Sequence, residues 1–171
     1  MVEFDEQIYL DEMQALLVEA RRRWLNDQAG VMVFTVSVWT DPGAAASAVS
    51  FDTYENSVRK VSAGNEWAET KRQFWLDRGD PEMAALFEPR SGRNGNPADF
   101  AFASFAEIEH RSFVSHWEET TDGACWDVLE PALLIVLQAA LRELDGLPLH
   151  ADAELGVNSR VDWYAVTRRF R

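Results

Sequence analysis

The stretch that decides the fold is VMVFTVSVWTDPGAAASAVSFDTY, residues 31–54. Residues 31–39 are rich in β-branched and aromatic side chains, which favour a β-strand. Their alternation gives a partly apolar face and a wholly apolar one, the latter formed by Met32, Phe34, Val36 and Val38. Such a strand is predicted away from the edge of a sheet. Asp41-Pro42-Gly43 is a turn and residues 47–54 alternate again, so the two strands are predicted to form an antiparallel hairpin.

Two long amphipathic helices are predicted outside this hairpin. The first spans about residues 5–26, and its apolar face consists of Met13, Leu16, Leu17, Ala20 and Trp24. The second lies within residues 125–144, and its apolar side consists of Leu129, Leu133, Val136, Leu137, Ala140, Leu141 and Leu144. Proline is better tolerated in the first turn of a helix than in its interior, so Pro131 is expected in the first turn.

Residues 56–78 also show helical spacing, with a break predicted at Gly64-Asn65 and Asn65 as the N-cap of the second part. A short helix is expected from Pro81 to Phe87. Residues 89–97 form the clearest loop, and a strand is predicted around residues 100–108 and again at 163–170. The fold class that follows is α+β: a mixed or largely antiparallel sheet packed against two to three helices in a single layer. We expect one globular domain over residues 1–171.

The charge of the chain is strongly negative, with 29 acids, 16 bases and a net charge of −13. Residues 98–130 hold eight acids and one base, Arg111. A negative field repels nucleic acid and anionic membranes, so neither is expected as a partner, whereas a basic protein would be attracted. A solvated acidic surface without any partner is the alternative. A single cysteine and an acidic N-terminal segment favour a cytoplasmic location.

The same segment supplies the candidate binding residues. Aromatic side chains surrounded by charge are typical of interface hot spots, and Phe113, Trp117 and Trp126 are interleaved with the acids. The predicted partner-binding residues are Glu107, Glu109, Glu118, Glu119, Asp122 and Trp117. The oligomeric state is left open.

Catalytic and cofactor motifs give little support for an enzyme. The sequence contains no Walker loop, dinucleotide fingerprint, zinc-protease helix or nucleophile elbow. Glu107, Glu109, His110, His116 and Glu118 could supply metal ligands, but a di-metal site needs a second Glu–His pair and further carboxylates. We therefore predict no catalytic residue, metal or cofactor, and interpret Cys125 as a buried structural thiol. A hydrolase without a local motif stays the last alternative.

A recurring combination of aspartate and tryptophan gives a second hypothesis, a binding site for a small cationic ligand or a carbohydrate. Aromatic faces attract cations, and carboxylates add charge. The residues concerned are Trp39, Asp41, Asp52, Trp117, Trp126, Asp127 and Trp163.

The order of the predicted elements resembles that of bacterial polymorphic-toxin immunity-type proteins. The resemblance rests on the N-terminal helix, the hairpin at residues 33–53, the ending LPLHADAELGVNSRVDWYAV at residues 147–166, and the low pI. The chain is also similar to other bacterial families of this size. The resemblance to immunity-type proteins implies a non-enzymatic protein that binds a toxin, often a nuclease, and occludes its active site.

Overall fold

The computed structural model describes residues 4–114 and 116–170, and the described chain divides into two compact units. The first unit contains the residues up to Tyr54 and those from Gly95 onward, and the second unit is Glu55–Asn94. The expectation of one globular domain over residues 1–171 stays a prediction. Each unit is described by itself below.

The first unit is built on a mixed sheet of β1 (Val33–Asp41), β2 (Ala46–Asp52), β3 (Phe102–Glu109), β4 (Leu149–Val157) and β5 (Val166–Arg169). The strand order is β3-β2-β1-β4-β5, in which β1 pairs antiparallel with β2 and parallel with β4. The other two pairings, β2 with β3 and β4 with β5, are antiparallel. The predicted hairpin and the central position of its first strand are confirmed.

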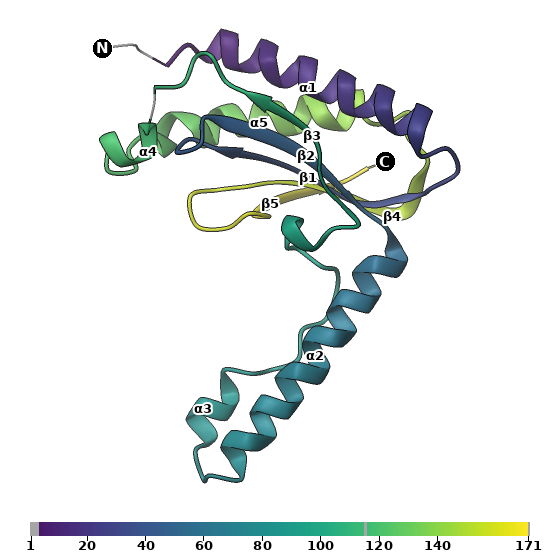
Figure 1. Ribbon diagram of the computed structural model, residues 1–171, viewed down its shortest axis with the longest axis vertical. Helices are drawn as coiled ribbons and strands as arrows, with labels where there is room; N and C mark the ends of the chain where they lie inside the picture. Colours follow the sequence, from purple (N-terminus) through teal and green to yellow (C-terminus); the bar gives the residue numbers. More distant parts are fainter. Residues whose placement is uncertain (1–3, 115, 171) are drawn as a thin grey trace. The chain divides into compact units, whose positions relative to one another are not determined.

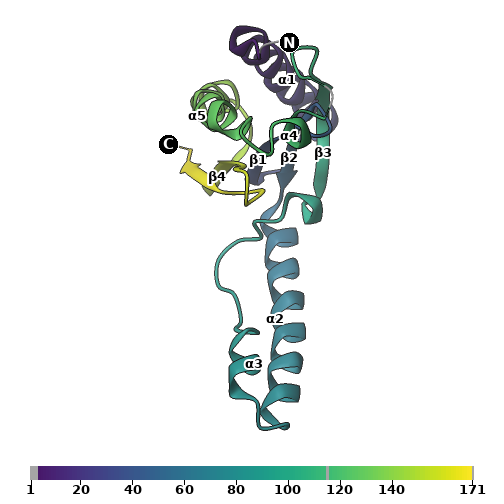
Figure 2. The same cartoon turned by 90° about the vertical axis from the view of Figure 1, so that its left-hand side faces the viewer.

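Two helices, α1 (Glu6–Asp27) and α5 (Trp126–Glu143), lie side by side along one face of this sheet (Figures 1 and 2). Asp5 begins α1, because its carboxylate accepts a hydrogen bond of 3.1 Å from the backbone N–H of Ile8. The core lies between the helices and the sheet, where the buried Trp24 ring packs against Phe51 and Phe102. The α+β fold class with a single layer of helices is therefore confirmed for the first unit.

Pro131 departs from its predicted place, because it lies inside α5 rather than in its first turn. Proline has no amide hydrogen, so the usual helical bond to the carbonyl of Asp127 cannot form. The apolar side of α5 is otherwise as predicted: Leu129, Leu133, Val136 and Leu137 are buried. Their burial stabilises the helix despite the missing bond.

The apolar face of β1 also needs a correction. The sequence predicts that Phe34 shares one apolar face with Val36 and Val38. In the structure the core contains Val33, Val36 and Val38 but not Phe34. The pairing of β1 with β4 shifts its register between Val33 and Thr35, and the regular alternation of faces along β1 does not hold at this point. Phe34 packs instead against the rings of Tyr54 and His150.

The second unit contains most of α2 (Tyr54–Leu76) and all of α3 (Pro81–Ala85). The predicted break at Gly64-Asn65 is wrong, because α2 is continuous. Asn65 is no N-cap: its side-chain amide donates to the carbonyl of Arg90 at 2.9 Å and accepts from the Arg90 N–H at 2.8 Å. The short helix is confirmed, and Asp80 caps it by accepting from the Met83 N–H.

Two shorter helices, η1 (Pro97–Asp99) and α4 (Trp117–Thr120), complete the described elements. Over residues 4–114 and 116–170, no helix combines the length and the apolar character needed to cross a membrane.

Trp24→Ala should lower the free energy of unfolding by about 3–5 kcal/mol, because the ring is fully buried among aromatic side chains. Trp67→Ala is the matched control, since Trp67 is 58% exposed and its loss should cost less than about 1 kcal/mol. Urea unfolding of the full chain measures both. Equal costs for the two variants would contradict the placement of Trp24 in the core.

Candidate functional site at the carboxyl ends of two parallel strands

The parallel pairing of β1 with β4 brings the carboxyl ends of both strands to one edge of the sheet. Val38 pairs with Val157, so the turn after β1 and the loop after β4 leave the sheet side by side. The buried side chain of Asn158 joins them: it accepts from the N–H of Thr40 at 3.0 Å and donates to its carbonyl at 2.8 Å. In open sheets with parallel strands, ligands commonly bind in the crevice at this edge.

Two adjoining hollows lie at this edge. The smaller, about 160 Å³, is lined by Asp41, Glu118, Arg160, Asp162 and Trp163 among others. The larger, about 450 Å³, lies along the N-terminal half of α5, and we call it the α5 groove. It is lined by Trp126, Asp127, Glu130, Pro131, Leu133, Leu134, Val157, Asn158, Ser159 and Val166. Trp126, Asn158 and Ser159 line both hollows, so the two are neighbours.

Hydrogen bonds hold the carboxylates around the hollows in place. Glu118 accepts from the indole N–H of Trp126 at 2.8 Å. Glu130 accepts from the backbone N–H of Arg160 at 3.1 Å. Asp41 accepts from the backbone N–H groups of Gly43 and Ala44, which fixes the turn after β1. These negative groups are therefore positioned before any ligand arrives.

The aspartate and tryptophan residues of the second hypothesis converge in part. The ring of Trp39 contacts that of Trp163, with their centroids 5.8 Å apart. Asp41, Trp126 and Trp163 line the smaller hollow, and Asp127 lines the α5 groove. Asp52 and Trp117 line neither hollow. The former ends β2 at the other end of the hairpin, and the latter belongs to the core.

The predicted partner-binding acids lie at two places on the first unit. Glu107 and Glu109 are exposed on the edge strand β3, opposite Ala48 and Ala46 of β2. Glu118 lines the smaller hollow, while Glu119 and Asp122 are exposed nearby in the chain. Within residues 4–114 and 116–170, neither Glu107, Glu109 nor Asp122 forms an ion pair.

Trp117 does not have the exposure that a partner anchor needs. It is only 8% exposed, and its ring stacks on Phe4 with centroids 5.0 Å apart. Phe113 and Trp126 are buried as well. These aromatic residues of segment 98–130 therefore anchor it to the core, and its exposed charged groups are mainly carboxylates.

The two units differ sharply in charge. Residues 55–94 carry seven acids and seven bases, so the whole net charge of −13 lies on the first unit. Exposed carboxylates on one unit produce a local negative field that attracts cations and basic proteins.

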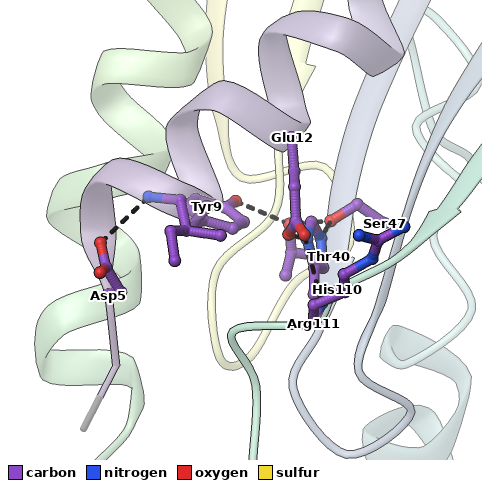
Figure 3. Close-up of polar contacts among 8 residues, drawn as sticks. Asp5, Tyr9, Glu12, Thr40, Ser47, His110 and Arg111 are labelled. Atoms are coloured by element: carbon purple, nitrogen blue, oxygen red, sulfur yellow. Dashed lines mark hydrogen bonds and ion pairs between the residues drawn. The ribbon is translucent and has the colours of Figure 1, made fainter.

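A second polar feature, which no local motif indicated, lies buried between α1 and the sheet (Figure 3). Ser47 Oγ lies 2.6 Å from His110 Nε2, and His110 Nδ1 lies 2.7 Å from Glu12 Oε2. The chain continues from Ser47 to the Thr40 hydroxyl at 2.6 Å and to the Tyr9 hydroxyl at 2.8 Å. A serine, a histidine and a carboxylate in this order are also the parts of a hydrolase triad.

The burial of these groups does not suit an active site. Ser47 and Thr40 are fully buried, and so is the His110 side chain, which leaves a substrate no access to the serine. Glu12 can only accept, so Nδ1 donates to it and Nε2 accepts from Ser47. Burial lowers the pKa of His110, against the opposing hydrogen bond and charge of Glu12. Burial also raises the pKa of Tyr9 far above its ordinary value. The chain is thus a hydrogen-bonded link between α1 and the sheet that ends at the Glu12 carboxylate.

The remaining candidates for chemistry are separated by the fold. His110 is buried, whereas the side chain of His116 is 69% exposed and faces Glu119. Burial raises the pKa of the Cys125 thiol, which disfavours the nucleophilic thiolate. In the part of the chain that the structure describes, no three His, Cys, Asp or Glu residues cluster closely enough to hold a metal ion.

Comparisons with known proteins give no further guide to the site. No protein-family model, no curated protein and no solved structure matches this chain.

His110→Gln should weaken the dependence of stability on pH. The folded-state pKa of His110 lies below its ordinary value of about 6.5, so the unfolded chain binds the proton more readily. The stability that neutral His110 contributes is present above about pH 6.5 and is lost as pH falls towards the lowered pKa. The difference in unfolding free energy between wild type and variant should therefore shrink from pH 7.5 to 5, as measured by urea unfolding. A difference that grows in acid would mean that the protonated histidine is favoured in the fold.

Proposed function

We propose that this chain is a non-enzymatic cytoplasmic binding protein that neutralises a basic protein partner through the acidic surface of its first unit. A toxin is the partner that the resemblance to immunity-type proteins implies. The observation that carries the proposal is the charge distribution: the entire net charge lies on one unit, and its exposed carboxylates include Glu107, Glu109, Glu119 and Asp122.

The physical basis is electrostatic steering. A negative surface accelerates the encounter with a basic protein and disfavours acidic competitors. Nucleases carry basic clefts that bind phosphate, and a surface rich in carboxylates can occupy such a cleft in place of the nucleic acid. Glu118 and Glu130 are already held by hydrogen bonds, so they lose little conformational freedom on binding.

A small cationic ligand is the second candidate, and the two adjoining hollows favour it. The α5 groove, at about 450 Å³, has the size of an ordinary ligand site. Tryptophan and carboxylate side chains surround the smaller hollow. A hydrolase has less support, because Ser47 is fully buried.

Reversing Glu107, Glu109 and Glu119 to Lys should slow association with the partner by about tenfold or more at low salt, because exposed charges act mainly on the on-rate. All three side chains are exposed, so folding should be little affected. The difference should shrink as salt rises, since exposed charges are screened beyond about 10 Å at 0.1 M. Surface plasmon resonance measures the association rate against the product of the gene immediately upstream, where a toxin would be encoded.

The matched control reverses three exposed acids of the neutral unit, Glu66, Glu69 and Glu88, and so changes the net charge by the same amount. This control should slow association less than the first variant. Equal association rates for wild type and the first variant at low salt would show that Glu107, Glu109 and Glu119 are not part of the interface. Absence of any binding to the upstream product would contradict the immunity function itself.

A further inference from the structure

We propose that the α5 groove binds an arginine side chain of the partner together with an apolar residue beside it. The inference rests on the proposed function and names the part of the partner that the groove recognises. A groove that combines an apolar floor with fixed carboxylates fits a segment that is both basic and apolar.

The floor of the groove is apolar and partly open to solvent. Its apolar lining consists of Pro131, Leu133 and Leu134 of α5 with Val157 of β4 and Val166 of β5. Leu134 is 47% exposed, although it lies next to buried core residues. Covering such a side chain removes apolar surface from water and favours binding. The methylene stem of an arginine can lie along the same surface while its charged end reaches the rim.

Two carboxylates lie on one turn of α5 at the rim of this groove. Asp127 and Glu130 are three residues apart, a spacing that puts both on the same side of a helix. Glu130 Oε1 accepts the N–H of Arg160, which fixes this carboxylate. Its second oxygen makes no hydrogen bond within residues 4–114 and 116–170. A planar guanidinium with five donors suits such a pair better than the compact ammonium of lysine.

The charge around both hollows favours a cation. The acids that line them are Asp41, Glu118, Asp127, Glu130 and Asp162. The single base in the two linings is Arg160. Its guanidinium packs against Gly123 and donates to the carbonyl of Asp122 at 3.4 Å. In the described chain Arg160 forms no ion pair with these acids, so their carboxylates are not paired with it and can contact a cationic ligand.

The test uses the full chain and a synthetic peptide, acetyl-Leu-Arg-Leu-Arg-amide, with the citrulline peptide acetyl-Leu-Cit-Leu-Cit-amide as its neutral counterpart. Titration followed by ¹H–¹⁵N NMR gives the dissociation constant and the backbone amides that shift. The arginine peptide should shift the amides of Asn158 and Ser159 and bind about tenfold more tightly than the citrulline peptide.

Two variants remove the proposed contacts without large changes in shape. Asp127→Asn with Glu130→Gln should weaken binding of the arginine peptide about tenfold, while the glutamine oxygen can still accept from Arg160. Leu134→Ala should weaken it about threefold to fivefold. The control for Leu134 is Ile135→Ala, because Ile135 is also 47% exposed but lines a different hollow, between α1 and α5.

The control for the carboxylates is Asp27→Asn with Asp145→Asn, which removes two exposed charges of the first unit that line neither hollow. Neither this variant nor Ile135→Ala should change binding by more than about twofold. An equal loss with this variant would show general attraction to the negative charge of the first unit and would overturn the proposed site in the groove. Equal binding of the citrulline peptide, or no binding of either peptide up to about 10 mM, would also overturn it. The proposed function is tested separately by the association rate with the product of the upstream gene. That measurement uses variants outside the groove.

Discussion

The parallel pairing of β1 with β4 is the constraint on which the rest of the first unit depends. Two parallel neighbours cannot be joined by a tight turn, so the chain must cross over before it returns to the sheet. That connection includes α5, which packs beside α1 on one face and closes the core. The same pairing puts the ends of both strands at one edge, where Asn158 fixes them to each other. The hollows at this edge therefore follow from the topology, and their chemistry comes from the loops and from the first turns of α5.

Polar groups are used in two distinct ways in this unit. A buried chain of hydrogen bonds runs from Tyr9 through Thr40, Ser47 and His110 to the Glu12 carboxylate, and it links α1 to the sheet. The exposed carboxylates are mostly without ion pairs in the described chain, and they repel one another. The proposed binding of a basic partner would offset this repulsion.

The sequence was most informative where the spacing of side chains is local. The core face of α1, the β1–β2 hairpin and α5 follow from periodicity within single segments, and all three are confirmed. It was least informative where distant segments meet. Nothing near His110 indicates Ser47 or Glu12, which lie 63 and 98 residues away in the chain. The break predicted at Gly64-Asn65 was wrong because Asn65 bonds to the backbone of Arg90, outside the helix. Trp117 was predicted to bind a partner, yet it is only 8% exposed and its ring stacks on Phe4, which is distant in sequence.

The central claim is that a basic partner binds the acidic surface of the first unit, including the edge at the carboxyl ends of β1 and β4. Hydrogen–deuterium exchange of the full chain, alone and with the product of the upstream gene, tests this claim most directly. Slower exchange is expected in the turn after β1, in residues 118–134 and in the loop after β4, because a docked partner excludes water from these amides. Exchange in residues 55–94 should be unchanged. Protection confined to residues 55–94, with none at the acidic edge, would contradict the account.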